Sequence, residues 1–243
     1  SLKSKIAHRV GRILYEGNVD IKIAPSDLAA KYTFGEKEYK MGHVKILHNA
    51  IDLDYFRFSE KSRIDNRHEL HIPEDAFAVG HIGRFSEQKN HLFLLDIFAR
   101  VTKKKPDAYL ILVGDGERKE QIQEKVQNLG LESRVIFTGV RSDIPALLSA
   151  FDVFLFPSFY EGMPNTVIEA QATGLPCVIS DTITKEADIT GLVQYMPLTA
   201  SPELWAEKAM KCVSQERVNT KEFFLREKYD IASVVEEFVR LCF

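Results

Sequence analysis

Short apolar runs alternate with amphipathic stretches along most of this chain. Val153–Phe156 and Cys177–Ser180 are runs of mainly apolar residues, as is typical of strands buried on both faces of a parallel sheet. Between such runs, apolar residues recur at helical spacing, for example at Leu92, Leu95 and Phe98. The alternation predicts an α/β fold, a doubly wound parallel sheet with helices on both faces.

The predicted strands of this sheet are Phe77–Ile82, Ala108–Val113, Val135–Phe137, Val153–Phe156, Cys177–Ser180 and, at an edge, Val193–Tyr195. Ser59–Asp75 is charged and irregular, which predicts a surface helix and loop. The last predicted helix is Phe223–Leu241, and its apolar stripe is typical of a helix that faces a core.

The first part of the chain predicts a smaller piece of structure. A helix is expected around Ile6–Leu14, followed by a strand at Ile21–Ala24 and a helix with Ser26 as its N-cap. This β-α unit has no partner strand nearby in the sequence, so we do not expect it to bury a core alone.

The stretch Phe159–Pro176 carries the most informative chemistry. It follows a predicted strand, begins as a loop and continues as a helix, with Pro164 in the first turn and Gly174 as the stop signal. Glu161 therefore lies on the loop, and Glu169 lies inside the helix. Both are expected at the carboxyl end of the sheet, where open α/β folds bind ligands.

Two carboxylates beside a helix N-terminus suit one class of ligand. A helix N-terminus attracts phosphate, and a carboxylate accepts hydrogen bonds from a vicinal diol. A nucleotide-sugar has phosphates in the middle and hydroxyl groups at both ends. The alternative is that Glu161 and Glu169 are solvated acids on a helix face.

Arg84 and Lys89 flank another loop at the end of a strand, and such cations bind phosphate oxygens. The alternative is a pair of surface cations that meet acids. Gly114-Asp115-Gly116 is not a dinucleotide-binding fingerprint, because Lys119 stands where the third glycine belongs. We interpret these glycines as a tight turn between strand and helix.

The composition of the chain argues against some classes of function. The chain has 243 residues, a net charge of −3 and 45% hydrophobic residues, so general nucleic-acid binding is not expected. Its three cysteines match no metal site, and we expect reduced thiols in a cytoplasmic protein. Asp52-Leu53-Asp54 spells a metal-nucleotide motif, but it lies far in sequence from the phosphate-binding residues, so we expect no metal site. His81 is expected to be a satisfied core residue.

Glu161 and Glu169, with seven residues between them, resemble the E-x7-E motif of retaining glycosyltransferases of the GT-B fold, above all family 4. The resemblance covers Val44–Ser214. It implies a Rossmann-like, C-terminal nucleotide-sugar-binding domain at residues 44–215. Residues 1–43 would be a remnant of the N-terminal acceptor domain, and residues 216–243 would be helices that cross back to that domain, an alternative to core packing for the last helix. The start at Ser1 without methionine fits a fragment.

The resemblance also implies roles for individual residues. Arg84 and Lys89 would stabilise the departing diphosphate, Glu161 would orient the sugar, and Glu169 would bind the ribose diol. The residues expected at the donor are Gly83, Arg84, Lys89, Val140, Arg141, Gly162, Met163, Asn165, Thr166 and Glu169. Many family members have a second glycine where this chain has Pro164, which removes one N–H that could bind phosphate.

The segments E-G-M-P-N and S-D-T-I-T resemble segments of bacterial enzymes of capsule, exopolysaccharide or O-antigen biosynthesis. The implied function is transfer of Gal, GalNAc, GlcNAc or Glc from a nucleotide-sugar, a UDP-sugar in most such enzymes, to a lipid-linked saccharide. No cofactor and no metal are expected, and peripheral association with the inner membrane stays open. A nucleotide-sugar epimerase, or a catalytically silent nucleotide-sugar-binding protein, remains an alternative.

Overall fold

The computed structural model describes residues 19–212 and 216–242. The helix predicted around Ile6–Leu14 lies outside them. The chain divides into two compact units, a smaller one made of Ser1–Ile51 and Lys228–Phe243, and a larger one made of Asp52–Glu227. The division falls later than the predicted boundary at residue 44, and it assigns residues 216–227 to the larger unit.

The smaller unit contains a two-stranded parallel sheet. Strand β1 (Lys22–Ala24) pairs with β2 (Val44–Ile46), so the prediction that the first strand lacks a nearby partner was wrong. Helix α2 (Asp27–Phe34) connects them, and its N-cap Ser26 accepts a hydrogen bond from the Ala29 amide, as predicted. Helix α3 (Glu36–Lys40) follows. Because β2 pairs with β1, it belongs to this unit and not to the second domain.

The C-terminal segment forms two helices where the sequence predicts one. Helix α10 (Lys221–Arg226) ends before Lys228, whose φ of 57° is incompatible with a continuous right-handed helix. Helix α11 (Ile231–Cys242) then begins inside the smaller unit. No residue of α11 is buried in the described structure, which contradicts the interpretation of its apolar stripe as an ordinary core face.

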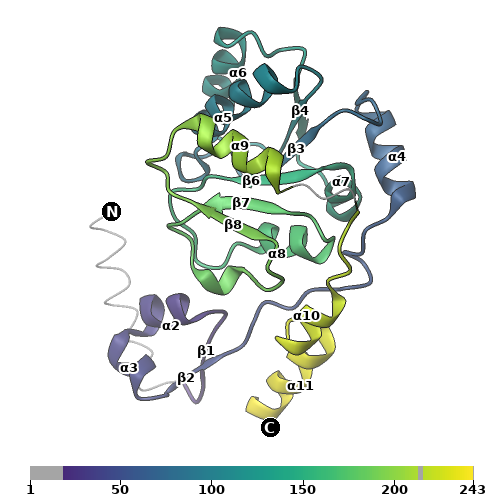
Figure 1. Cartoon of the computed structure of the whole chain (residues 1–243). Helices are drawn as coiled ribbons and strands as arrows, with labels where there is room; N and C mark the ends of the chain where they lie inside the picture. The colour runs from purple at the N-terminus through teal and green to yellow at the C-terminus, as the bar shows by residue number, and fades with distance from the viewer. Residues whose placement is uncertain (1–18, 213–215, 243) are drawn as a thin grey trace. The chain divides into compact units, whose positions relative to one another are not determined.

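The larger unit is built on a sheet of six parallel strands in the order β5-β4-β3-β6-β7-β8 (Figure 1). The strands are β3 (Ala78–Ile82), β4 (Tyr109–Val113), β5 (Val135–Gly139), β6 (Val153–Phe156), β7 (Cys177–Ser180) and β8 (Val193–Met196). These bounds confirm the predicted strands to within two residues. β8 lies at an edge, as predicted.

Helices cover both faces of this sheet and bury a core on each (Figure 1). One core includes Leu94, Phe98 and Trp205, from α5 and α9, and the other includes Leu148 and Val167, from α7 and α8. The helices are α4 (Glu60–Glu69), α5 (His91–Lys104), α6 (Lys119–Asn128), α7 (Ile144–Ala150), α8 (Asn165–Ala172) and α9 (Pro202–Lys211). This layered α/β arrangement confirms the predicted fold class.

The strand order places a topological switch point at the centre of the sheet. The chain runs outward from β3 through β4 to β5, returns to β6 beside β3, and runs outward in the other direction to β8. The loops after β3 and β6 therefore diverge from neighbouring strands, and such a point is where open α/β sheets bind ligands.

Candidate active site

Lys89 and Glu161 meet at the switch point. Lys89 ends the short 3-10 helix Glu87–Lys89 after β3, and Glu161 lies on the loop between β6 and α8. The Lys89 Nζ lies 2.8 Å from Glu161 Oε1, and the two side chains are only 17% and 10% exposed. The ammonium also lies 4.5 Å from the centre of the Phe156 ring. The sequence placed both residues at the same edge of the sheet, and the structure brings them into contact.

Arg84 lies on the same loop as Lys89 but points into solvent. Its side chain is 73% exposed, and its Nε lies 3.1 Å from Glu117 Oε2. Exposed ion pairs of this kind contribute little to stability, so the guanidinium can leave Glu117 for a stronger anion at small cost. Glu117 was not identified from the sequence. It follows the neighbouring strand β4 and therefore lies at the same edge of the sheet.

The turn after β4 fixes the loop that carries Arg84. A Cβ on Gly114, whose φ is 136°, would lie 2.2 Å from the Gly83 carbonyl oxygen. A Cβ on Gly116 would lie 2.6 Å from the Phe85 carbonyl oxygen. The predicted tight turn is therefore also a close contact between two backbones, and only glycine fits at either position.

The N-terminus of α8 offers free amide groups beside Glu161. Pro164 occupies the N-cap position, one residue before the helix, and has no N–H. Among the residues that the structure describes, the amides of Gly162, Met163 and Thr166 have no protein acceptor. The arrangement can bind an anion, because free N–H groups and the helix dipole point the same way.

Gly174 ends α8 as predicted. Its φ is 68°, its amide donates to the Gln171 carbonyl, and the Leu175 amide donates to the Ala170 carbonyl. These are the two hydrogen bonds of a Schellman motif. The helix that carries Glu169 therefore has a defined end as well as a defined start.

Glu169 is a half-buried carboxylate on α8. In the described part of the chain its side chain has no hydrogen-bond or ion-pair partner. Burial raises the pKa of Glu169, since desolvation disfavours the charged form. An acceptor that is partly desolvated and unpaired is suited to receive hydroxyl groups of a ligand.

In the loop after β5 the charged side chains pair with acids of the protein, and the backbone is left to contact a ligand. Val140 is 80% exposed. Arg141 pairs with Asp143 at 2.7 Å and with Glu69 at 2.6 Å. Asp143 stands at the N-cap of α7, but its side chain binds Arg141 instead of a helix amide. With the Arg141 guanidinium held by two acids, this loop has main-chain groups and an apolar side chain to offer a ligand.

Two buried histidines lie under the Lys89 loop. His81 Nδ1 lies 2.8 Å from the Leu155 carbonyl oxygen, but among the described residues its Nε2 has no partner. The prediction of a satisfied core residue therefore holds for one of its two ring nitrogens. The His91 ring is 4.6 Å from that of His81, and neither of its nitrogens has a partner in the part of the chain that the structure describes. Burial and the nearby Lys89 charge lower the pKa of His91 to about 4. Both rings are therefore neutral near pH 7.

The Asp52-Leu53-Asp54 motif forms a turn. The Asp52 carboxylate accepts hydrogen bonds from the amides of Asp54 and Tyr55 at 3.1 and 2.9 Å. Within residues 19–212 and 216–242 there is no cluster of side chains that could hold a metal. Over the same residues, no helix has both the length and the apolar character needed to span a membrane.

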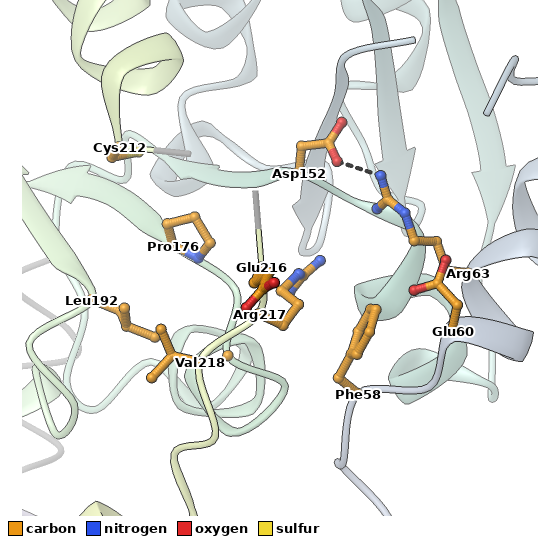
Figure 2. Close-up of a pocket in the computed structure, with 11 residues that line it drawn as sticks. Phe58, Glu60, Arg63, Asp152, Pro176, Leu192, Cys212, Glu216, Arg217 and Val218 are labelled. Atoms are coloured by element: carbon orange, nitrogen blue, oxygen red, sulfur yellow. Dashed lines mark hydrogen bonds and ion pairs between the residues drawn. The ribbon is translucent and has the colours of Figure 1, made fainter. Parts of the chain in front are cut away.

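A cavity of about 400 Å³ lies at the opposite end of the strands (Figure 2). Its lining includes Asp152, Pro176 and Leu192, each of which directly precedes a strand. Arg63 pairs with Asp152 at 2.7 Å (Figure 2). Arg217 donates to the carbonyl groups of Leu148, Phe151 and Thr173. These guanidinium groups bond carbonyls at the C-terminal ends of α7 and α8. Because the cavity lies at the amino ends of the strands, it is separate from the predicted site at their carboxyl ends.

The sequence model of the glycosyl transferases group 1 family matches residues 76–215 of this chain. EpsF of Bacillus subtilis (strain 168), whose name places it provisionally among the glycosyltransferases, is 35% identical over 93% of this chain and 58% of its own length. The UDP-Gal:alpha-D-GlcNAc-diphosphoundecaprenol alpha-1,3-galactosyltransferase of Escherichia coli is 33% identical over 57% of this chain and 36% of its own length. The chain thus spans less than two thirds of these relatives.

Solved structures agree with these relatives. Anabaena HepE in complex with UDP is 25% identical, with a TM-score of 0.81 over 98% of this chain and 67% of its own. WaaG, a glycosyltransferase involved in lipopolysaccharide biosynthesis, has the same fold with a TM-score of 0.72 over 90% of this chain and 62% of its own. Together with the six-stranded parallel sheet, they identify the larger unit as the Rossmann-like C-terminal domain of a GT-B fold. This chain belongs to the glycosyl transferases group 1 family.

Proposed function

We propose that this chain is the donor-binding part of a retaining family 4 glycosyltransferase. The enzyme moves a hexosyl unit from a UDP-sugar to a lipid-linked saccharide during synthesis of a bacterial surface polysaccharide. The observation that carries the proposal is the contact between Lys89 and Glu161 at the switch point of the sheet. It joins a diphosphate-binding cation and a sugar-binding acid beside the free amides of Gly162, Met163 and Thr166.

The donor lies across the two loops in this proposal. Its diphosphate takes Lys89 and a reoriented Arg84, with further hydrogen bonds from the amides of Gly162, Met163, Asn165 or Thr166. Both cations stabilise the negative charge that builds up on the leaving diphosphate. They supply positive charge that a metal ion provides in other transferases. Gly83 allows close approach of the loop to the phosphates.

The two ends of the donor meet other residues. Glu169 accepts hydrogen bonds from the ribose diol, and its unpaired state in the structure supports this role. The base lies against the backbone of Val140 and Arg141. Glu161 leaves Lys89 to the diphosphate and accepts hydrogen bonds from the sugar hydroxyls. The choice of UDP is supported by the UDP complex of HepE and by the E. coli galactosyltransferase.

The acceptor site belongs to the rest of the protein in this proposal. The shares of 58% of EpsF and 67% of HepE support a longer protein in which residues 19–51 are the end of an N-terminal acceptor domain. The unburied apolar stripe of α11 is expected to pack on that domain. The enzyme would then work at the cytoplasmic face of the inner membrane, where lipid-linked acceptors are found.

Calorimetry on this chain with UDP, UMP and uridine tests the donor assignment. UDP should bind most tightly, and Arg84→Ala should weaken UDP by about 1.5–3 kcal/mol while leaving uridine unchanged, since charge-assisted hydrogen bonds contribute that much. Equal affinities for UDP and uridine would refute the diphosphate assignment.

A donor screen on the complete protein, with products identified by mass spectrometry, tests the reaction. We expect transfer to a lipid-linked saccharide by the complete protein, none by this chain alone, and none by the complete Glu161→Ala variant. Release of free UDP without an acceptor would favour an epimerase. UDP binding without turnover would favour a silent binding protein.

A further inference from the structure

The loop that carries Glu161 has no secondary structure of its own, so other residues must hold its position. Its first half is attached from the β7 side. The hydroxyl groups of Ser180 and Thr182 both donate to the carbonyl of Ser158, which is fully buried. Beyond Ser158 the chain leaves the core, because Phe159 and Tyr160 are 44% and 64% exposed.

Gln88 holds the exposed half of this loop through two hydrogen bonds. Its backbone carbonyl accepts from the Phe159 amide at 2.9 Å, and its side-chain amide donates to the Tyr160 carbonyl at 2.8 Å. The next residue, Lys89, contacts Glu161. Two consecutive residues after β3 therefore hold three consecutive residues after β6, across the switch point.

Lys89 and Glu161 differ in how the protein holds them. Lys89 is placed by its own 3-10 helix and by the Phe156 ring. Glu161 has no such support once a diphosphate has taken the Lys89 ammonium. At that stage, Gln88 and the Ser158 carbonyl are the remaining attachments of the main chain just before Glu161 among the described residues.

We propose that Gln88 is a positioning residue, which holds the Glu161 carboxylate at the sugar end of the donor while Lys89 is bound to the diphosphate. The inference rests on the proposed function, because it concerns the same site. It predicts that loss of the Gln88 side-chain amide weakens contacts to the sugar and spares contacts to the diphosphate.

Two Gln88 variants and one control test this role in the chain as it stands. Gln88→Met keeps the length of the side chain without a hydrogen bond, and Gln88→Glu turns the donor into an acceptor facing the Tyr160 carbonyl. Gln121→Met is the matched control, because Gln121 is exposed and its side chain, among the described residues, accepts one hydrogen bond, from Arg118 at the N-cap of the same helix. Calorimetry would use UDP, UDP-glucose, UDP-galactose and their N-acetylhexosamine counterparts.

We expect the Gln88 variants to change the affinity for the UDP-sugar more than the affinity for UDP. Gln88→Met should keep UDP affinity within about twofold and lose roughly two- to tenfold for the UDP-sugar that wild type prefers, the range expected for one net hydrogen bond. Gln88→Glu should lose more, and Gln121→Met nothing. Unchanged UDP-sugar affinity in both Gln88 variants, or an equal loss for UDP, would overturn the inference.

Hydrogen exchange of the segment 158–162 separates this inference from the proposed function. Exchange should be faster in both Gln88 variants than in wild type and in the Gln121→Met control. If wild type bound no UDP, the proposed function would fail, and exchange would still decide whether Gln88 holds the loop. Equal exchange rates in all variants would refute the role of Gln88 whatever the ligand results.

Discussion

The Lys89 ammonium lies 2.8 Å from the Glu161 carboxylate, although 72 positions in the sequence separate them. Each is the other's charge partner in the free protein, and each is assigned to a different part of the donor. In the proposed donor complex, the diphosphate draws Lys89 away from Glu161. The ion pair satisfies both charges in the free protein, and under the proposed function it competes with the donor.

Glu161→Gln should strengthen UDP binding. The neutral amide no longer competes for Lys89, so we expect roughly a two- to tenfold rise in affinity, the size of one hydrogen bond. The unfolding free energy should fall by about 1–3 kcal/mol, because Lys89 is left largely buried without its counter-charge. Calorimetry and urea unfolding check both effects. Glu132→Gln, at an exposed acid, is the control, and weaker UDP binding by Glu161→Gln would contradict the competition.

Glu169→Gln should stabilise the protein and weaken uridine binding. The folded-state pKa of Glu169 is raised above its ordinary value of 4.5, so its charge opposes folding at neutral pH. The variant should therefore unfold at higher urea than wild type at pH 7.5, and this difference should vanish below pH 4.5. Uridine affinity should fall, since one carboxylate oxygen is lost to the ribose diol. A variant that bound uridine as wild type does would refute the ribose assignment.

His91→Phe should make folding less sensitive to acid. His91 has a pKa of about 4 in the folded state against 6.5 ordinarily, so its contribution to stability is complete above pH 6.5 and is lost as the pH falls toward 4. The loss amounts to about 3 kcal/mol. Urea unfolding at pH 7.5 and 4.5 measures it, with exposed His68→Gln as control. The variant should still lose some stability, because the pKa of His81 is also lowered by burial.

Gly114→Ala should destabilise the protein and weaken UDP binding together. Its Cβ would lie 2.2 Å from the backbone oxygen of Gly83, so the loop that carries Arg84 must move. Gly130→Ala is a matched control, because Gly130 also has positive φ but open space around it, and it should cost only about 1 kcal/mol of strain. We expect more than twice that loss for Gly114→Ala. Equal losses, with UDP affinity retained, would show that the contact does not position the loop.

The sheet was predictable because each strand is a compact apolar run. Val153–Phe156 and Cys177–Ser180 match their predicted bounds. The helix boundary near the C-terminus and the strand pairing near the N-terminus were harder to predict. The separation of α10 from α11 at Lys228 has no glycine or proline to mark it, and the pairing of β1 with β2 joins segments separated by two helices.

The site was predictable as a set of positions but not as a set of contacts. The carboxyl ends of parallel strands share one edge, so Lys89 and Glu161 could be placed there from the sequence. Which acid pairs with which cation depends on loop paths, so the pairings of Arg84 with Glu117 and of Arg141 with Glu69 were not foreseen. The same limit concealed Arg67 of α4, predicted as a surface helix, which is buried against Asp152.

The pairing of Ile51 with the segment after Lys228 has a consequence for modularity. The Ile51 amide donates to the Tyr229 carbonyl at 2.8 Å, and the Tyr229 ring stacks on His48. Residues 52–227 are thus a continuous insertion whose entry and exit are adjacent in the smaller unit. Such an insertion can be exchanged through two neighbouring splice points. Recombination at these points would replace residues 52–227 as one piece and leave the smaller unit unchanged.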